Sequence, residues 1–263
     1  MRARVGIVAL LLAALTLATL WQPNDPFALD LAARHAGASP DYPLGTDHLG
    51  RCLLSRLMLG AGNTALVVVL VAGLSFALGV VVGTIAALAG GAVESMLLRS
   101  AELVIAVPTL ILALTVTTLV GLGPVTAGFA LGLASWGPYA LLAHALASRT
   151  LARPHVLAAR AMGGGGPNIA RRHVLPETMG TMRAYLAADA GRTVVSYASL
   201  AFLGLGAETS RPDWGAVLFE YRGFVFDAPM LMVWPGLAIS LTALALNVAI
   251  EPRSPNAAME IRR

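Results

Sequence analysis

The sequence predicts an all-α, polytopic membrane protein with six transmembrane helices. Of its 263 residues, 57% are hydrophobic and only 12% are charged, and the mean hydropathy is +0.75. Soluble domains carry about 25% charged residues, so this chain is too apolar for an aqueous surface. Its charge-free runs are also long enough to cross a bilayer core, which takes roughly 20 residues per helix.

Five apolar runs account for the six spans, and they cover residues 5–21, 63–93, 103–148, 183–206 and 228–250. The third run is long enough for two helices. Gly121, Gly123 and Pro124 supply a break within it, because glycine admits unusual dihedral angles and proline lacks a backbone donor. The first run follows Arg2 and Arg4 as in a signal peptide, but no small-x-small cleavage site follows, so we expect an uncleaved helix.

The distribution of arginine predicts that both termini are cytoplasmic, because positively charged residues near span ends tend to stay inside the cell. With the N-terminus inside, twelve arginines fall on the cytoplasmic side and five on the other side, which also holds eight acidic residues. We expect a first helix and an extracytoplasmic loop at residues 1–62 and a five-helix core at residues 63–252. A cytoplasmic loop at about 150–180 lies within that core, and a cytoplasmic tail follows at 253–263.

The composition excludes several classes of enzyme. The chain has no lysine, which removes the P-loop and Schiff-base chemistries, and its single cysteine, Cys52, cannot form an internal disulfide or a cysteine cluster. Its five histidines show no HExxH spacing, and no GxSxG motif is present. We therefore expect no catalytic residues, no metal site and no cofactor bound by this chain. We interpret the net charge of +4 as a topology signal, with no nucleic-acid partner.

Two features within the predicted spans each leave two interpretations open. Asp189 and Arg192 stand three residues apart in the fifth span, where they either line a pathway or form a structural ion pair. Small residues recur every fourth position in the second span and again in the fourth span, which indicates either a subunit interface or gate, or packing within one bundle. We favour packing for these residues, which are Ser75, Gly79, Gly83 and Ala87, with Gly128 and Gly132.

The predicted cytoplasmic loop is basic and rich in glycine. A helix of small residues, a glycine turn, a second short helix beginning near Pro167 and a stop at Pro176 would form a compact knob, here residues 154–176. Such a knob suits docking on a soluble partner. The alternative is an ordinary positive-inside loop, which composition alone does not exclude.

Spacing within the knob resembles a known family. Ala158, Ala159, Gly163, Leu175 and Pro176 match the EAA loop of permease subunits in ATP-binding cassette importers, with Ala-Ala-x-x-x-Gly, nine residues, then x-x-Leu-Pro. The resemblance is sharpened by Pro-Leu-Gly-Thr-Asp-His-Leu-Gly-Arg at 43–51 and by Phe-Leu-Gly-Leu-Gly at 202–206. Over residues 21–247 the chain is similar to the C-type permease of the dipeptide, oligopeptide and nickel importer subfamily.

The resemblance implies the fold of a type I importer permease and a function in moving dipeptides or short oligopeptides across the cytoplasmic membrane of a prokaryote. A nickel permease of the same subfamily is the runner-up, and a non-transport membrane sensor or scaffold is the alternative of another class. The implied partners are a second, homologous permease, two ATPase subunits that use ATP and magnesium, and an extracytoplasmic solute-binding protein.

The resemblance also implies roles for individual residues. The knob would face the ATPase, with the alanine pair allowing close approach, Gly163 making the turn and arginines supplying polar contacts. The knob residues concerned are Ala158, Ala159, Arg160, Gly163, Arg171, Arg172 and Pro176. The contacts expected for the binding protein are Asp47, Trp214, Glu220 and Tyr221.

The chain departs from the family pattern at four places. Leu157 replaces the leading glutamate of the EAA loop, and Cys52 stands where an aspartate usually follows Gly-Arg. The turn is Gly-Gly-Gly at 163–165 in place of Gly-Ala-Ser, which predicts a more flexible knob. After Asn247 the expected acidic helix is replaced, which puts in doubt any contact that this tail makes in relatives.

Overall fold

A computed structural model describes residues 2–121, 123–203 and 212–248, and every regular element in these ranges is a helix. The all-α prediction is therefore confirmed for this part of the chain, while the predicted tail at 253–263 lies outside it. The elements are α1 (Arg2–Ala18), η1 (Leu31–Ala33), α2 (Leu53–Ala89), α3 (Gly91–Ala106), α4 (Thr109–Val120), α5 (Pro124–Leu151), α6 (Pro154–Ala161), α7 (Gly166–Ile169), η2 (Ala170–Val174), α8 (Leu175–Phe202), α9 (Trp214–Tyr221), η3 (Arg222–Phe224) and α10 (Met230–Val248).

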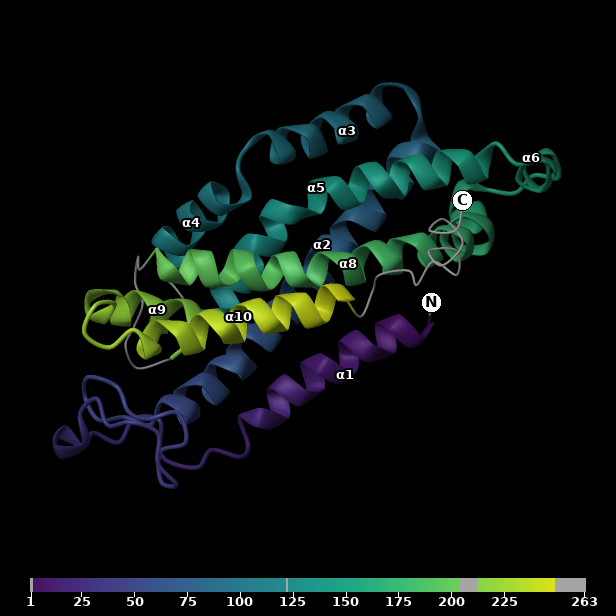
Figure 1. The fold of residues 1–263 in the computed structure, drawn as a ribbon. Coiled ribbons are helices and arrows are strands. Elements are labelled where there is room, and N and C mark those ends of the chain that lie inside the picture. The colour runs from purple at the N-terminus through teal and green to yellow at the C-terminus, as the bar shows by residue number, and fades with distance from the viewer. Residues whose placement is uncertain (1, 122, 204–211, 249–263) are drawn as a thin grey trace, which may run out of the picture.

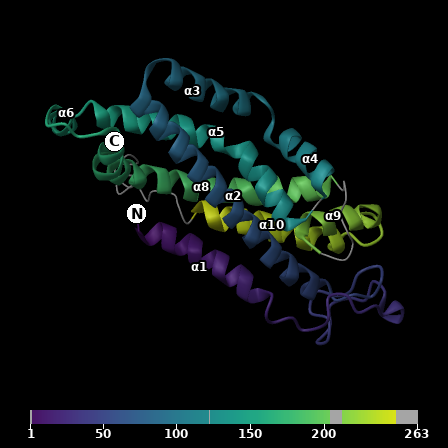
Figure 2. The ribbon, with the colours of Figure 1, turned by 180° about the vertical axis from the view of Figure 1, so that it is seen from behind.

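The long helices lie side by side, with short elements gathered at the two ends of the bundle (Figures 1 and 2). The loop at residues 19–52 and helix α9 occupy one end, and α6 and α7 occupy the other. The start of α1 lies at the α6 end, and α10 runs toward that same end from α9 (Figure 1). This arrangement puts both ends of the described chain on the side of the knob.

Within the part of the chain that the structure describes, three helices are long and apolar enough to cross a bilayer, namely α2, α5 and α10. Helices α3 and α4, which meet at an angle of 86°, would add a fourth span if they act together. Helix α1, at 17 residues, and α8, which carries four charged residues, are not among them. The count of six spans therefore stays a prediction.

Helix α2 is longer than its predicted span. It begins at Leu53 and runs for 37 residues, or about 55 Å at 1.5 Å per residue, well beyond a bilayer core of about 30 Å. It ends at Ala89 and is followed by Gly90, whose φ of +67° favours glycine. The predicted domain boundary at residue 62 is corrected, because α2 passes through it without interruption and belongs to both proposed parts.

The predicted break at residues 121–124 separates α4 from α5, and Pro124 begins α5. A second break, at Val107 and Pro108, was missed by the sequence analysis. Val107 is extended, with φ −90° and ψ 130°, since the ring of a following proline disfavours the helical conformation. Charge-free sequence alone therefore does not mark one straight helix.

The small residues of α2 pack against α5 within the bundle. A Cβ added at Gly79 would overlap the Cβ of Tyr139, and one added at Gly83 would overlap the carbonyl oxygen of Ala140. On the same face, the Ser75 hydroxyl donates a hydrogen bond to the carbonyl of Gly132 at 3.0 Å. The packing interpretation is confirmed, and we call this contact the α2–α5 seam.

Replacing Gly79 with leucine should separate the two helices of the seam. Overpacking of this kind costs about 1–3 kcal/mol, and here the obstacle is the base of a side chain in α5, which cannot move alone. We expect a lower melting temperature in detergent and a lower yield of folded protein. Gly73→Leu is the matched control, because Gly73 lies in the same helix with nothing within 4 Å of an added Cβ. Equal melting temperatures for the two variants would contradict a close seam.

Candidate functional site

The knob consists of α6, a glycine turn, α7 and the single π-helical turn η2, which continues directly into α8. Gly163 has a φ of +85°, which lies in the left-handed region. A residue with a side chain would be strained in this backbone conformation. Pro167 lies in the first turn of α7, as expected. The predicted stop at Pro176 is corrected, because Pro176 lies in the first turn of α8, where a helix tolerates its missing N–H.

The knob is anchored by an apolar base and exposed at its tip. Val156 is the buried residue of α6, and it packs with Ile169 and Val174 of the knob against the end of α5. At the tip, Leu157 is 51% exposed and Met162 is 82% exposed. Ala159 is half-buried, whereas most residues predicted to face a partner are exposed, namely Ala158, Arg160, Gly163, Arg171, Arg172 and Pro176.

A polar contact fastens the knob to α8, and the sequence analysis missed it. Glu177, in the first turn of α8, accepts a hydrogen bond from the Thr150 hydroxyl at 3.1 Å. Its carboxylate also lies 3.0 Å from Nη1 of Arg153 and 3.3 Å from Nε2 of His155. One signal was available, since Glu177 is the sole acidic residue among the arginines of residues 148–183. We call Glu177 with these three partners the Glu177 latch.

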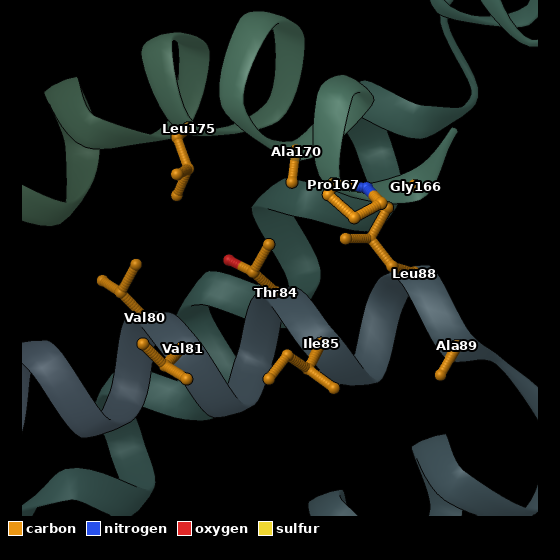
Figure 3. A pocket seen from close by; sticks show the side chains of 10 residues that line it. All are labelled: Val80, Val81, Thr84, Ile85, Leu88, Ala89, Gly166, Pro167, Ala170 and Leu175. Atoms are coloured by element: carbon orange, nitrogen blue, oxygen red, sulfur yellow. The ribbon is translucent and has the colours of Figure 1, made fainter. Parts of the chain in front are cut away.

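An apolar groove of about 490 Å³ separates the knob from the end of α2 (Figure 3). Aliphatic side chains of α2, including Val80 and Ile85, line one wall, while Pro167, Ala170 and Leu175 line the other. Thr84 contributes a hydroxyl. The knob rests mainly on the end of α5 and continues into α8, and Ala87 and Leu88 of α2 pack against the same apolar cluster, while open space remains beside other residues of the last turns of α2.

Asp189 and Arg192 face each other on α8, with 2.7 Å between Oδ1 and Nη2. The Asp189 side chain is 9% exposed and also accepts a hydrogen bond from the Tyr139 hydroxyl at 3.0 Å, so its charge has two donors. The Arg192 side chain is 62% exposed. The geometry is that of an ion pair in which one charge is buried and the other is exposed.

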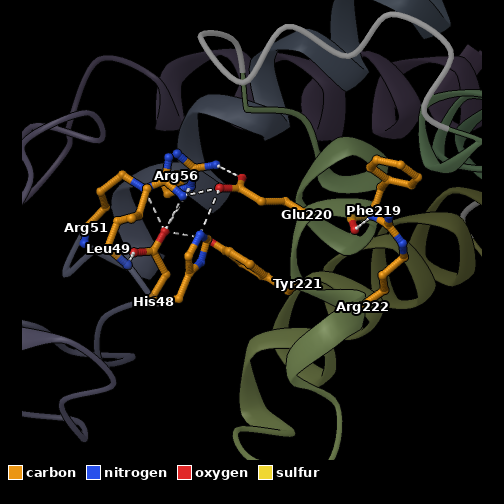
Figure 4. A network of polar contacts seen from close by, with 9 residues as sticks. His48, Leu49, Arg51, Arg56, Phe219, Glu220, Tyr221 and Arg222 are labelled. Atoms are coloured by element: carbon orange, nitrogen blue, oxygen red, sulfur yellow. Dashed lines mark hydrogen bonds and ion pairs between the residues drawn. The ribbon is translucent and has the colours of Figure 1, made fainter.

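At the opposite end, the loop before α2 and helix α9 are joined by the loop–α9 network, which consists of Asp47, His48, Arg51, Arg56, Glu220 and Tyr221 (Figure 4). Arg51 donates from Nε to Asp47 at 2.6 Å and also binds Glu220. Arg56 donates to Glu220 at 2.6 Å, and the Tyr221 hydroxyl donates to Asp47 at 2.9 Å. The network thus pairs buried arginines near the start of α2 with a carboxylate of α9 that lies far away in the sequence.

The network shifts the ionisation of its members. Burial opposes charge on Asp47, but hydrogen bonds from the side chain and backbone of Arg51 outweigh it and hold the pKa of Asp47 below its usual range. Burial likewise opposes charge on Arg51, yet its hydrogen bonds to Asp47 and Glu220 raise its pKa. Burial lowers the pKa of His48, against the attraction of Asp47 and Glu220. Asp47 and Arg51 are therefore held as an ion pair.

Burial corrects the expected contacts with a binding protein. Asp47 and Tyr221 are fully buried, and Trp214, 4% exposed, donates from Nε1 to the carbonyl of Leu57 at 2.8 Å. These three residues fasten α9 to the loop and to α2, so they do not offer side chains to another protein. Glu220, whose side chain is 15% exposed, is the member of the predicted set that reaches the surface.

Three potential metal ligands, on Asp47, His48 and Glu220, lie within 4.8 Å of one another. A divalent cation at this position would meet Arg51 and Arg56, whose guanidinium groups already bind the two carboxylates. The positive charges of these two arginines disfavour a cation nearby. The carboxylates of Asp47 and Glu220 are already paired with the arginines, so they do not need a metal ion.

Comparison with known proteins identifies a family with which this chain shares sequence. Residues 79–252 match the model of the binding-protein-dependent transport system inner membrane component family. The chain belongs to this family of permeases. It is 32% identical to the nickel transport system permease protein NikC of Escherichia coli K12 over 248 residues, which cover 92% of this chain and 87% of that protein.

Peptide permeases are similar relatives. The di/tripeptide transport system permease protein DppC of Pseudomonas aeruginosa is 30% identical over 249 residues, covering 90% of this chain and 82% of that protein. The probable D,D-dipeptide permease DdpC of E. coli K12 is 27% identical over 242 residues, covering 92% and 81%. The resemblance to the peptide and nickel subfamily is confirmed. The protein is a multi-pass permease of ATP-binding cassette importers, a family that works with ATPase and substrate-binding partners.

Opening of the loop–α9 network can be followed through the permease's own cysteine. Cys52 is 1% exposed and adjoins Arg51. Removing one partner of a buried ion pair costs about 3–5 kcal/mol, so Asp47→Asn should speed labelling of Cys52 by a maleimide about tenfold or more. Asp41→Asn, an exposed change in the same loop, is the control and should leave the rate unchanged. Slow labelling in both variants would show that the network does not hold the loop.

The turn of the knob provides a second prediction. Gly163→Val forces a β-branched side chain into the left-handed region, whereas Gly165→Val sits at φ −69°, which valine adopts readily. Neither added Cβ meets an atom within 4 Å, so the two variants differ in backbone strain alone. We expect Gly163→Val to reduce solute-stimulated ATP hydrolysis in the reconstituted transporter while Gly165→Val retains it. Equal activity would remove the conformational role of Gly163.

Proposed function

We propose that this permease forms half of the translocation pathway of an ATP-driven importer for dipeptides or short oligopeptides. A second, homologous permease would supply the other half, two ATPase subunits would bind ATP and magnesium, and a solute-binding protein would deliver the solute. The observation that carries this proposal is the attachment of the knob, whose tip is exposed while its base is joined to two long helices.

The tip of the knob has the properties of a docking surface. Exposed Leu157 and Met162 offer apolar area, and Ala158 and Ala159 leave room for close approach. Arg160 adds a charge at the end of α6. A permease without a nucleotide-binding motif receives its energy mechanically, and this end of the chain is where an ATPase would act.

A push on α6 reaches the bundle by two routes. Val156 transmits it to the end of α5 through the apolar base, and the Glu177 latch transmits it to the start of α8. The groove beside α2 gives the knob space in which to move (Figure 3). Rigid-body displacement of α5 and α8 would then alternate access to the pathway, as in other transporters.

The opposite end of the bundle is suited to the binding protein. The loop–α9 network fixes the loop at residues 19–52 against α9, which produces a rigid platform with Glu220 at its edge. We assign this end to the outside of the cytoplasmic membrane and the knob to the cytoplasm, together with both termini. The arginine distribution supports this orientation, as does the start of α1, which lies at the knob end of the bundle (Figure 1).

The chemistry of the described helices favours peptides over a metal. Among the described residues, the group of three potential metal ligands lies in the loop before α2 and in α9, where arginines neutralise it, and the small cavity within the bundle is lined by Asp189, Arg192 and residues with hydroxyl groups. These groups suit a zwitterion better than nickel, which prefers nitrogen ligands. The similarity to a nickel permease keeps nickel as the second candidate, and a sensor or scaffold would have no use for the anchored knob.

The test is transport by the complete complex in proteoliposomes. We expect ATP-dependent uptake of a labelled dipeptide, with nickel chloride neither transported nor competing. Ala159→Glu, which places a charge against the docking surface, should release the ATPase subunits during co-purification and abolish uptake. Ala28→Glu, an exposed change at the other end, is the control for assembly and should retain the ATPase subunits. Uptake of nickel without dipeptide would replace the proposed solute, and normal assembly of Ala159→Glu would remove the knob as the docking site.

A further inference from the structure

Arg192 exposes a charged side chain far from either end of its helix. It is the eighteenth of 28 residues in α8 and lies ten residues, or about 15 Å, before the end at Phe202. Its side chain is 62% exposed although its partner Asp189 is buried. Exposing a charged side chain to lipid at such a depth costs about 2.5–3.5 kcal/mol on insertion scales, and Asp189 covers only part of the guanidinium, so this face of α8 adjoins water or polar groups.

The surroundings of Arg192 are polar on more than one helix. A small cavity of about 70 Å³ is lined by Asp189, Arg192 and hydroxyl groups from α4, α5 and α8. The hydroxyl-bearing residues are Thr109, Ser135, Thr193 and Ser196. A cavity of this volume and chemistry holds a few waters or a group as small as a carboxylate.

The ion pair leaves Arg192 with unused binding capacity. A guanidinium has five N–H donors, and a single carboxylate engages at most two of them in a bidentate pair. Asp189 in turn keeps the hydrogen bond from Tyr139 if Arg192 moves away, and the Tyr139 ring is braced edge-on by Tyr185, with 4.8 Å between centroids. Asp189 can therefore hold Arg192 in position and also release it.

We propose that Arg192 is a binding site for a carboxylate of the solute, on a hydrated face of α8 that lines the translocation pathway. This inference rests on the proposed import of peptides and adds a recognition element to it. A short peptide carries one carboxylate at its C-terminus, and charge-assisted, bidentate contact with Arg192 would stabilise it part-way across the membrane. Asp189 is the positioning residue that keeps the guanidinium in the path when no solute is present.

The first test measures access of water to this face. Arg192→Cys is made in a Cys52→Ser background and treated with a water-soluble methanethiosulfonate reagent in the assembled transporter. We expect reaction at position 192 and slower reaction when dialanine and its binding protein are present. Ala187→Cys, on the same helix but 6% exposed, is the buried control and should stay unreacted. No reaction at position 192, with or without ATP, overturns the inference.

The second test separates solute binding from a purely structural ion pair. Arg192→Gln leaves Asp189 without its partner and should lower both the yield of complex and dialanine uptake. In Asp189→Asn with Arg192→Gln the unpaired charge is gone, so the yield should recover, but uptake per assembled complex should stay about tenfold or more below that of the unaltered protein. Arg192→Lys, which keeps a charge without the planar fork, should fall between.

Recovery of both yield and uptake in the double variant would show that Arg192 only neutralises Asp189, and it would overturn the proposal that Arg192 binds a carboxylate of the solute. The outcome is distinct from failure of the proposed function, which would appear as no dialanine uptake by the unaltered complex. In that case the reactivity of Arg192→Cys still reports whether this face of α8 is hydrated, and an unreactive position 192 would overturn the inference on its own.

Discussion

The α2–α5 seam is the contact on which the rest of the structure depends. Gly79 and Gly83 let the two longest apolar helices approach closely, so that the backbone of α2 lies against the Cβ atom of Tyr139 and the backbone of α5. A methyl group at either glycine would not fit. Helix α2 carries the loop–α9 network at its beginning, and α5 carries the knob at its end. The seam therefore joins the two helices that carry the two functional ends of the molecule.

At three levels along the described part of this bundle, a carboxylate is shared among several donors. Glu177 gathers Thr150, Arg153 and His155 at the knob, and Asp189 gathers Tyr139 and Arg192 in the middle. At the far end, Asp47 and Glu220 share Arg51. Shared contacts of this kind specify geometry more than they add stability, because desolvation offsets much of the attraction. They fix where elements meet while the apolar clusters hold the elements together.

The sequence predicted the helices well and their ends poorly. Charge-free runs identified α2, α5 and α10, because in a bilayer backbone groups are satisfied within each helix and the apolar surface faces lipid. The start of α2 at Leu53 was not predicted, since Arg56 lies in its first turns and its charge is neutralised by Glu220, 164 residues away. The effects of Pro108 and Pro176 depend on whether the chain bends or a helix begins there, which local sequence does not decide.

In the candidate site, too, local patterns were visible in the sequence and long-range contacts were not. The alanine and glycine spacing of the knob was visible because it is local, and the pairing of Asp189 with Arg192 because it spans three residues. Contacts between distant residues were not visible. Burial of Asp47 and Tyr221 follows from the docking of α9, and the Glu177 latch follows from the meeting of α5, α6 and α8. The exposed Arg192 beside its buried partner adds a further asymmetry: a guanidinium turned toward lipid would be costly, so its exposure indicates that this face of α8 adjoins water or polar groups.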